Sequence, residues 1–125
     1  LGVVGMDNQV TAVELLEMVN KGQRTFSRIC VEDGVLTEFD FSNLSFEECL
    51  FSVNFTGANF ENTRFINSNL KTCNFSNCNL SNAVFDGNLL DGTEFLGARI
   101  NGVRFINNTF HSMVLTEAHL AKMIR

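Results

Sequence analysis

The chain has 125 residues, a net charge of −5 at pH 7, no proline and no tryptophan, and 45% of its residues are hydrophobic. The length is that of a single domain, and no apolar run is long enough for a membrane span. Residues 1–50 hold nine acids and three bases, whereas residues 51–125 hold five acids and six bases, so the C-terminal part carries no strong field of one sign.

The N-terminal segment, residues 1–25, is expected to contain one helix. Residues 1–5, LGVVG, are too short for a signal peptide and lack a basic lead. Thr11 and Glu14 have the spacing of a capping box, in which each side chain bonds the backbone N–H of the other residue. Apolar side chains then recur on one face at helical spacing, which predicts a helix over residues 12–20.

The segment after this helix carries a large apolar residue at every fifth position. A four-residue step from Phe51 to Phe55 joins it to a longer run of the same spacing. An alternative register centred on Phe39 and Leu44, with a bulge near Cys49, fits nearly as well, so the sequence leaves the choice open. The first register runs through Phe26, Val31, Leu36, Phe41, Phe46 and Phe51.

From Phe55 to Leu120 the spacing of five holds without a miss for fourteen positions. A period of five fits neither an amphipathic helix nor a half-buried strand. A short internal repeat of this kind indicates a stacked structure in which each unit buries its apolar face against its neighbours. We call the following the ladder residues, with Leu120 as their continuation: Phe55, Phe60, Phe65, Leu70, Phe75, Leu80, Phe85, Leu90, Phe95, Ile100, Phe105, Phe110 and Leu115.

The other repeat positions support a stack. The residue two before each ladder residue is mostly small, and extended chain turns residues i and i−2 to the same side, so both are expected inside. Ser68, Asn88 and Asn108 form a polar column in this inner set, and buried polar groups of this kind need hydrogen-bond partners. Two residues after the ladder residues stand Gly or Asn, which tolerate the positive φ of a tight turn: Gly57, Asn62, Asn67, Asn77, Asn82, Gly87, Gly92, Gly97, Gly102 and Asn107.

The order small, polar, large, Ser/Thr, Gly/Asn resembles the pentapeptide repeat family. Clean instances are residues 58–60 (ANF), 68–70 (SNL) and 78–82 (CNLSN), and the resemblance covers at least residues 53–115. It implies an all-β solenoid, a right-handed quadrilateral β-helix with four pentapeptides to a coil, and twenty repeat centres then make about five coils. The way the chain opens also looks like that of small bacterial members, which are abundant in cyanobacteria.

These expectations divide the chain into three segments. Residues 1–25 carry the capping helix, residues 26–115 form the repeat β-helix, and residues 116–125 form a coil or short cap helix. The caps are expected because the ends of a stack expose apolar interior and unpaired strand edges. Gyrase-directed members of the family use the C-terminal end as a dimer interface, so a homodimer through that end is a further expectation.

The sequence shows no catalytic or metal-binding constellation, so we expect neither an enzyme nor a cofactor. His111 and His119 fall at outward positions, and we expect no nucleophile or acid to be held beside either of them. Cys49, Cys73 and Cys78 are expected to pack as reduced thiols in small inner slots, which favours a cytoplasmic setting. No phosphate-binding loop or metal-ligand spacing occurs.

One outward cluster has the composition of an interface. Apolar side chains there lie near stacked arginines, a combination that protein–protein contacts favour. We call this set the candidate patch: Arg64, Ile66, Val84, Leu89, Arg104 and Ile106.

The function that these features favour is that of a non-catalytic scaffold that binds another protein. The alternative comes from the resemblance, because some family members are acidic rods that mimic duplex DNA, bind DNA gyrase and give quinolone protection. The near-neutral repeat body and the short chain depart from that pattern. Direct nucleic-acid binding is not expected, since the sequence has no basic stripe.

Overall fold

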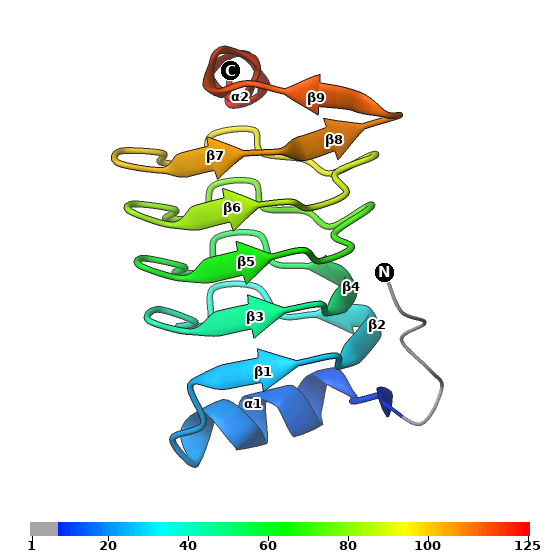
Figure 1. Cartoon of the computed structure of the whole chain (residues 1–125). Coiled ribbons are helices and arrows are strands. Elements are labelled where there is room, and N and C mark those ends of the chain that lie inside the picture. The colour runs from blue at the N-terminus through cyan, green and yellow to red at the C-terminus, as the bar shows by residue number, and fades with distance from the viewer. Residues whose placement is uncertain (1–7) are drawn as a thin grey trace.

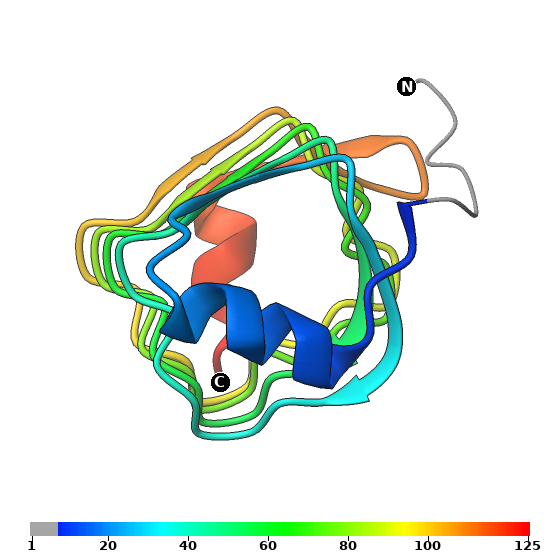
Figure 2. The ribbon, with the colours of Figure 1, turned by 90° about the horizontal axis from the view of Figure 1, so that it is seen from below.

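The computed structural model describes residues 8–125, so the run LGVVG discussed above lies outside the described part of the chain. The chain winds into a right-handed quadrilateral β-helix whose coils are stacked along one axis (Figure 1) and whose outline is four-sided (Figure 2). The predicted fold class, an all-β solenoid with an N-terminal helical cap, is therefore confirmed.

One side of the solenoid is a continuous parallel sheet, which we call the five-strand face. Its five strands stack in the order β1-β3-β5-β6-β7, so four complete turns separate the first strand from the last, and the chain then begins a fifth. Each strand pairs with the next coil in register, as Phe65 does with Phe85. The strands are β1 (Thr25–Ser27), β3 (Ser45–Glu47), β5 (Arg64–Ile66), β6 (Val84–Asp86) and β7 (Arg104–Ile106).

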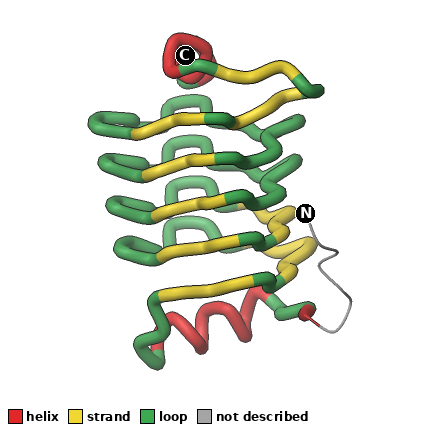
Figure 3. Tube along the Cα trace, viewed as in Figure 1, coloured by secondary structure: helices red, strands yellow, loops and turns green. Residues whose placement is uncertain are grey.

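The other sides contain little regular strand, as the loop colour in Figure 3 shows. On the side that follows the five-strand face, β2 (Cys30–Val35) pairs in parallel with β4 (Leu50–Asn54). At the C-terminal end β8 (Asn108–Phe110) pairs with β9 (Met113–Leu115), and this pair is antiparallel. Single bridges between the remaining coils continue the stacking around the solenoid.

The turns at the corners set the spacing of five. All ten Gly and Asn positions predicted to turn have φ between 48° and 78°. Among residues with positive φ, the only interval longer than five between residues 28 and 107 runs from Glu48 to Gly57. At that place the pairing of β2 with β4 shifts by one residue. The four-residue step from Phe51 to Phe55 is thus a corner without a left-handed residue.

The burial of the aromatic side chains decides between the two registers. Phe41 and Phe46 are buried, whereas Phe39 leaves 43% of its surface exposed, and Leu44 is buried in the neighbouring inner slot. The register through Phe41, Phe46 and Phe51 is therefore correct, and the alternative centred on Phe39 is wrong.

Phenylalanine rings stack directly above one another in the core. Phe55, Phe75 and Phe95 form one column with centroid distances of 5.4 and 5.5 Å, and Phe65 and Phe85 are 5.0 Å apart in another. Rings of neighbouring columns meet edge to face, which is the other favourable arrangement of aromatic pairs. Eleven of the thirteen ladder residues are buried; the exceptions are Ile100 and Phe110, which are partly buried near the C-terminal end.

Helix α1 (Ala12–Asn20) lies across the opening of the first coil (Figure 2). The predicted capping box is present: the N–H of Glu14 donates to Thr11 Oγ1 at 3.0 Å, and the N–H of Thr11 donates to Glu14 Oε1 at 2.8 Å. Leu15 is fully buried against the core. The helix therefore covers apolar interior that would otherwise face water.

Helix α2 (Glu117–Met123) lies over the last coil (Figure 1). Its Leu120 is buried, and the carbonyl of Ile124 accepts a hydrogen bond of 2.7 Å from the N–H of Gly97. That bond takes the place of one that a further coil would provide. The division of the chain at residues 25 and 115 stays a prediction.

We predict that Phe85→Ala destabilises the protein by about 3–5 kcal/mol, because it removes a ring that stacks on Phe65 and lies against Phe105, and leaves a cavity in a close-packed core. Denaturant unfolding followed by circular dichroism measures this loss. Val84→Ala, on the outward side of the same strand, is the control and should cost less than about 1 kcal/mol. A melting temperature of Phe85→Ala within about two degrees of the parent would contradict the stacked core.

Candidate functional site

The five-strand face brings together five of the six patch residues. Arg64, Val84 and Arg104 follow one another in one outward column, because their strands pair at these positions. Ile66 and Ile106 lie in the second outward column of the same strands. The structure thus places these five side chains on one flat surface.

The sixth patch residue lies around the corner. Leu89 bridges to Asn69 below it and Thr109 above it, on the side that follows the five-strand face. Asp86, which is not among the predicted patch residues, stands between Ile66 and Ile106 in their column. The patch is therefore a mixed array of apolar and charged side chains, not a continuous apolar surface.

The arginines of the patch are free to meet a partner. Arg64 and Arg104 are exposed, and within residues 8–125 neither forms an ion pair. Two levels of the stack separate them, which is about 10 Å at the usual strand spacing. Ile106 leaves 37% of its surface exposed, and Ile66 is half-buried beside them.

A groove marks the corner between the five-strand face and the side that carries Leu89. It is a cavity of about 290 Å³, and its lining includes Glu48, Asn67, Gly87 and Leu89. Ser68 of the inner polar column is part of the same lining. A ligand bound in this groove would need hydrogen-bond donors or acceptors of the polar column that the fold leaves free.

The polar column replaces a turn hydrogen bond that this corner lacks. At other corners the inner residue donates to the carbonyl three residues earlier, as the N–H of Ala58 does to Phe55 at 2.9 Å. At the groove corner the N–H of Ser68 donates instead to Asn88 Oδ1 at 2.9 Å. The N–H of Asn88 donates in the same way to Asn108 Oδ1 at 3.0 Å.

The amide groups of the column also occupy the carbonyls that this corner leaves free. Asn88 Nδ2 donates to the Phe65 carbonyl and Asn108 Nδ2 to the Phe85 carbonyl, each at 2.9 Å. Among the described residues no buried side-chain nitrogen or oxygen lacks a partner. The hydrogen-bonding groups of the polar column are therefore all satisfied within the fold, and the column has a structural role.

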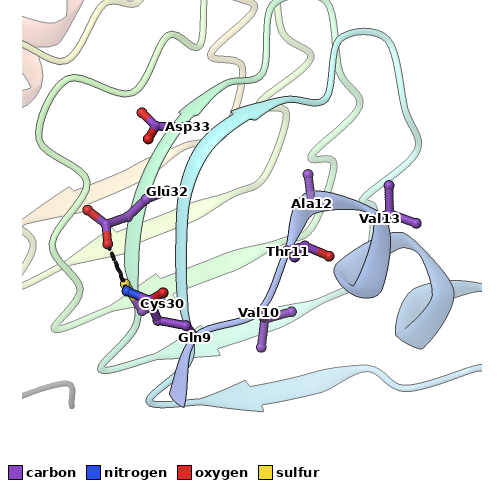
Figure 4. A pocket seen from close by; sticks show the side chains of 8 residues that line it. All are labelled: Gln9, Val10, Thr11, Ala12, Val13, Cys30, Glu32 and Asp33. Atoms are coloured by element: carbon purple, nitrogen blue, oxygen red, sulfur yellow. Dashed lines mark hydrogen bonds between the residues drawn. The ribbon is translucent and has the colours of Figure 1, made fainter. Parts of the chain in front are cut away.

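A second cavity lies at the N-terminal end, between residues 9–13, at the start of α1, and β2 (Figure 4). Its volume is about 540 Å³, and Glu32 and Asp33 make it acidic. Gln9 Nε2 donates to Glu32 Oε1 at 3.2 Å, and the Cys30 thiol donates to the same oxygen at 3.5 Å. The repeat period does not predict this cavity, because it depends on how the helix docks.

The chemistry of this cavity is not that of a nucleophilic site. Burial raises the pKa of the Cys30 thiol, and the hydrogen bond to Glu32 and the charge of that carboxylate raise it further. A thiolate is the reactive form of cysteine, so these surroundings suppress reactivity. Residues 8–125 hold no cluster of three or more His, Cys, Asp or Glu side chains that fits a metal ion.

The structure corrects our expectation for one histidine. His111 Nδ1 lies 3.3 Å from Asp91 Oδ2, so an acid does stand beside it, one coil below. This contact can be predicted from the sequence, because Asp91 and His111 are twenty residues, or one coil, apart. His119 is instead part of the α2 capping box, where its Nδ1 accepts from the N–H of Thr116 at 2.9 Å.

The four cysteines are free and buried. Cys73 and Cys78 donate hydrogen bonds to the carbonyls of Phe51 and Phe55 at 3.1 and 3.0 Å. Burial raises the pKa of each of these two thiols to about 12. For Cys49, burial raises the pKa to about 11.

The repeat pattern and geometry described above match a known protein family. A family model described as "Pentapeptide repeat region" matches residues 39–115. Sequence comparison with curated proteins gives no match. Neither helix of the described range is long and apolar enough to cross a membrane.

Solved structures of pentapeptide repeat proteins are similar to the chain. A trypsin-treated variant of QnrB1, a plasmid-mediated fluoroquinolone resistance protein, is 20% identical with a TM-score of 0.44, over 68% of this chain and 53% of that one. The chain therefore spans about half the length of that QnrB1 structure. The protein alr5209 from Nostoc PCC 7120 is 24% identical with a TM-score of 0.46, over 92% of this chain and 97% of that one. A protein of the Arabidopsis thaliana thylakoid lumen is 19% identical with a TM-score of 0.28, over 80% of this chain and 72% of that one.

We predict that Asn88→Ala destabilises the protein by about 2–4 kcal/mol, because it leaves the N–H of Ser68 and the carbonyl of Phe65 buried without their partners. Denaturant unfolding measures the loss. Asn101→Ala, at an exposed outward position, is the control and should cost less than about 1 kcal/mol. Equal losses for the two variants would show that the inner column does not hold the corner.

We also predict that Cys49, Cys73 and Cys78 do not react with an aromatic disulfide reagent at pH 8 in the folded protein, because burial keeps them as thiols. All four thiols should react in denaturant. Rapid labelling of two or more in the native state would contradict the burial, and fewer than four in denaturant would indicate a disulfide.

Proposed function

The chain belongs to the pentapeptide repeat family, and from this premise we propose that it is a non-catalytic scaffold whose five-strand face binds another protein. The observation that carries the proposal is the candidate patch, in which two arginines without an ion-pair partner among residues 8–125 share one surface with two isoleucines. Arginine and large apolar residues are enriched where proteins bind each other.

The core supports this role because it fixes the surface. Every patch strand carries a buried phenylalanine between its two outward side chains, and Phe65 and Phe85 are stacked at 5.0 Å. A surface held in this way loses little conformational entropy when it binds, which favours affinity. The regular spacing of the strands also presents charges at fixed intervals.

The chemistry of the patch indicates the kind of partner. Arg64 and Arg104 suit carboxylates at a separation of about two strands, and the isoleucines suit apolar side chains between them. Asp86 in the middle of the second column disfavours a purely acidic partner surface. We therefore propose a folded protein partner with mixed acidic and apolar residues, and a cytoplasmic setting in which the four thiols stay reduced.

The DNA-mimic alternative fits the surface less well. A mimic of duplex DNA needs a continuous acidic face, whereas the five-strand face carries Arg64 and Arg104 in one column and Asp86 in the other. We expect no change in gyrase supercoiling activity when the protein is added. Clear inhibition or protection of gyrase in that assay would favour the alternative over the scaffold.

We predict that Ile66→Glu combined with Ile106→Glu abolishes recovery of the partner in a quantitative pull-down from the native cell. The reason is that two side chains that would be buried by the partner are replaced by charged ones. The control is Ser76→Glu combined with Asn101→Glu, which adds the same charge on other sides of the solenoid. Loss of a protein with the patch variant and its retention with the control support the proposal. Unchanged recovery with both variants would remove the patch from consideration.

A further inference from the structure

Charge is divided between the two ends of the rod. Residues 8–50, which form α1 and the first coils, hold eight acids and three bases. Residues 96–125, which form the last coil and α2, hold one acid and four bases. Because the coils stack along one axis, these opposite charges lie at opposite ends of the molecule (Figure 1).

The outer surface of α1 carries an apolar side chain beside acids. Val13 leaves 66% of its surface exposed, although Leu15 of the same helix is fully buried. Glu17 follows Val13 by one helical turn and is also exposed, so the two side chains share a face. Glu17 forms no ion pair within the described residues, and Lys21 is the nearest base along the helix.

The opposite end offers the complementary features. A hollow of about 260 Å³ opens beside α2 and is lined by Phe110, Leu115 and Met123, with His119 and Lys122. Lys122 is exposed, and the described residues include no ion-pair partner for it. The hollow is thus apolar in its floor and basic at its rim.

The surroundings of α2 extend this surface. Three large apolar side chains near the end are exposed by half or more, and the exposed residues of the helix are small or basic except for Glu117 at its first position. An apolar end of this kind resembles the edge that a solenoid would cover with its next coil. The exposed apolar residues are Leu96, Met113 and Val114; the exposed residues of α2 include Ala118, Ala121 and Lys122, and Arg125 follows the helix.

We propose that the occupant of this end is a second copy of the chain, docked head to tail. Val13 of one copy enters the apolar hollow beside α2 of the next, and Glu17 pairs with Lys122. Charge selects this arrangement over a symmetric contact between two α2 ends, because residues 96–125 hold four bases against the single acid Glu117, so two such ends carry the same net charge. This assembly is independent of the binding role of the five-strand face.

The contact has two consequences. It is heterologous, so it does not close on itself and extends into linear chains of molecules. The end of one narrow rod buries a small area, so the contact is weak and transient. Association therefore grows with protein concentration and falls with salt.

Sedimentation equilibrium of the full chain tests the proposal, at protein concentrations up to about 1 mM, where contacts this small associate. We expect the average mass to rise beyond that of a dimer at low salt and to fall toward the monomer at about 0.5 M salt. Glu17→Lys and Lys122→Glu should each weaken association by about tenfold. An equimolar mixture of the two variants should regain it, because each supplies the charge that the other lacks.

The controls carry the same charge changes away from the ends. Glu61→Lys matches Glu17→Lys, and Lys71→Glu matches Lys122→Glu, and both should associate as the parent does. Melting temperatures of all variants establish that they fold. A monomer at every concentration overturns the proposal, and so does loss of association with Lys122→Glu but not Glu17→Lys, which would indicate a symmetric contact between α2 ends.

Discussion

The fold depends on the vertical hydrogen bonding of one coil to the next. Backbone groups of adjacent coils pair at about 4.8 Å, and this spacing brings residues one coil apart directly over each other. The same distance suits the stacking of aromatic rings, so Phe55, Phe75 and Phe95 gain ring contacts and burial from a single constraint. The corners must then turn the chain at fixed intervals, which explains the left-handed residue at every fifth position. Where this residue is missing, between Glu48 and Gly57, the spacing drops by one and the strand pairing shifts.

Much of the architecture could be predicted because it follows from this one period. The ladder residues, the Gly and Asn residues of the turns and the α1 capping box are local sequence patterns. They can therefore be predicted without information on tertiary contacts. The register before Phe55 was ambiguous because Phe39 is as large as the residues of the true register, and only its exposure at the first coil distinguishes it. Two neighbours that the sequence prediction does not include follow from the period of twenty residues per coil. Asp91 stands twenty residues before His111, and Asp86 stands twenty residues after Ile66 and twenty before Ile106. The cavity beside Cys30 was beyond reach, because it depends on the docking of α1.

The surfaces follow from the same geometry. A stack fixes the outward side chains as firmly as the inward ones, so the candidate patch is a rigid array whose members are set by spacing alone. The ends obey other rules, because each lacks a neighbouring coil. α1 and α2 cover most of the apolar interior there, yet both leave charged and apolar side chains exposed. We therefore propose the sides of the rod as the surface for a foreign partner and its ends as the surface for another copy of the same chain.

The central claim is that contacts between coils, including the side-chain column at the open corner, hold the surface in place. Native-state amide hydrogen exchange tests it most directly. We expect the N–H groups of Ser68 and Asn88, which bond side chains of the next coil, to exchange as slowly as those of Phe65 and Phe85 and only through global unfolding. Exchange of the Ser68 and Asn88 amides at rates near those of exposed loops would contradict the account.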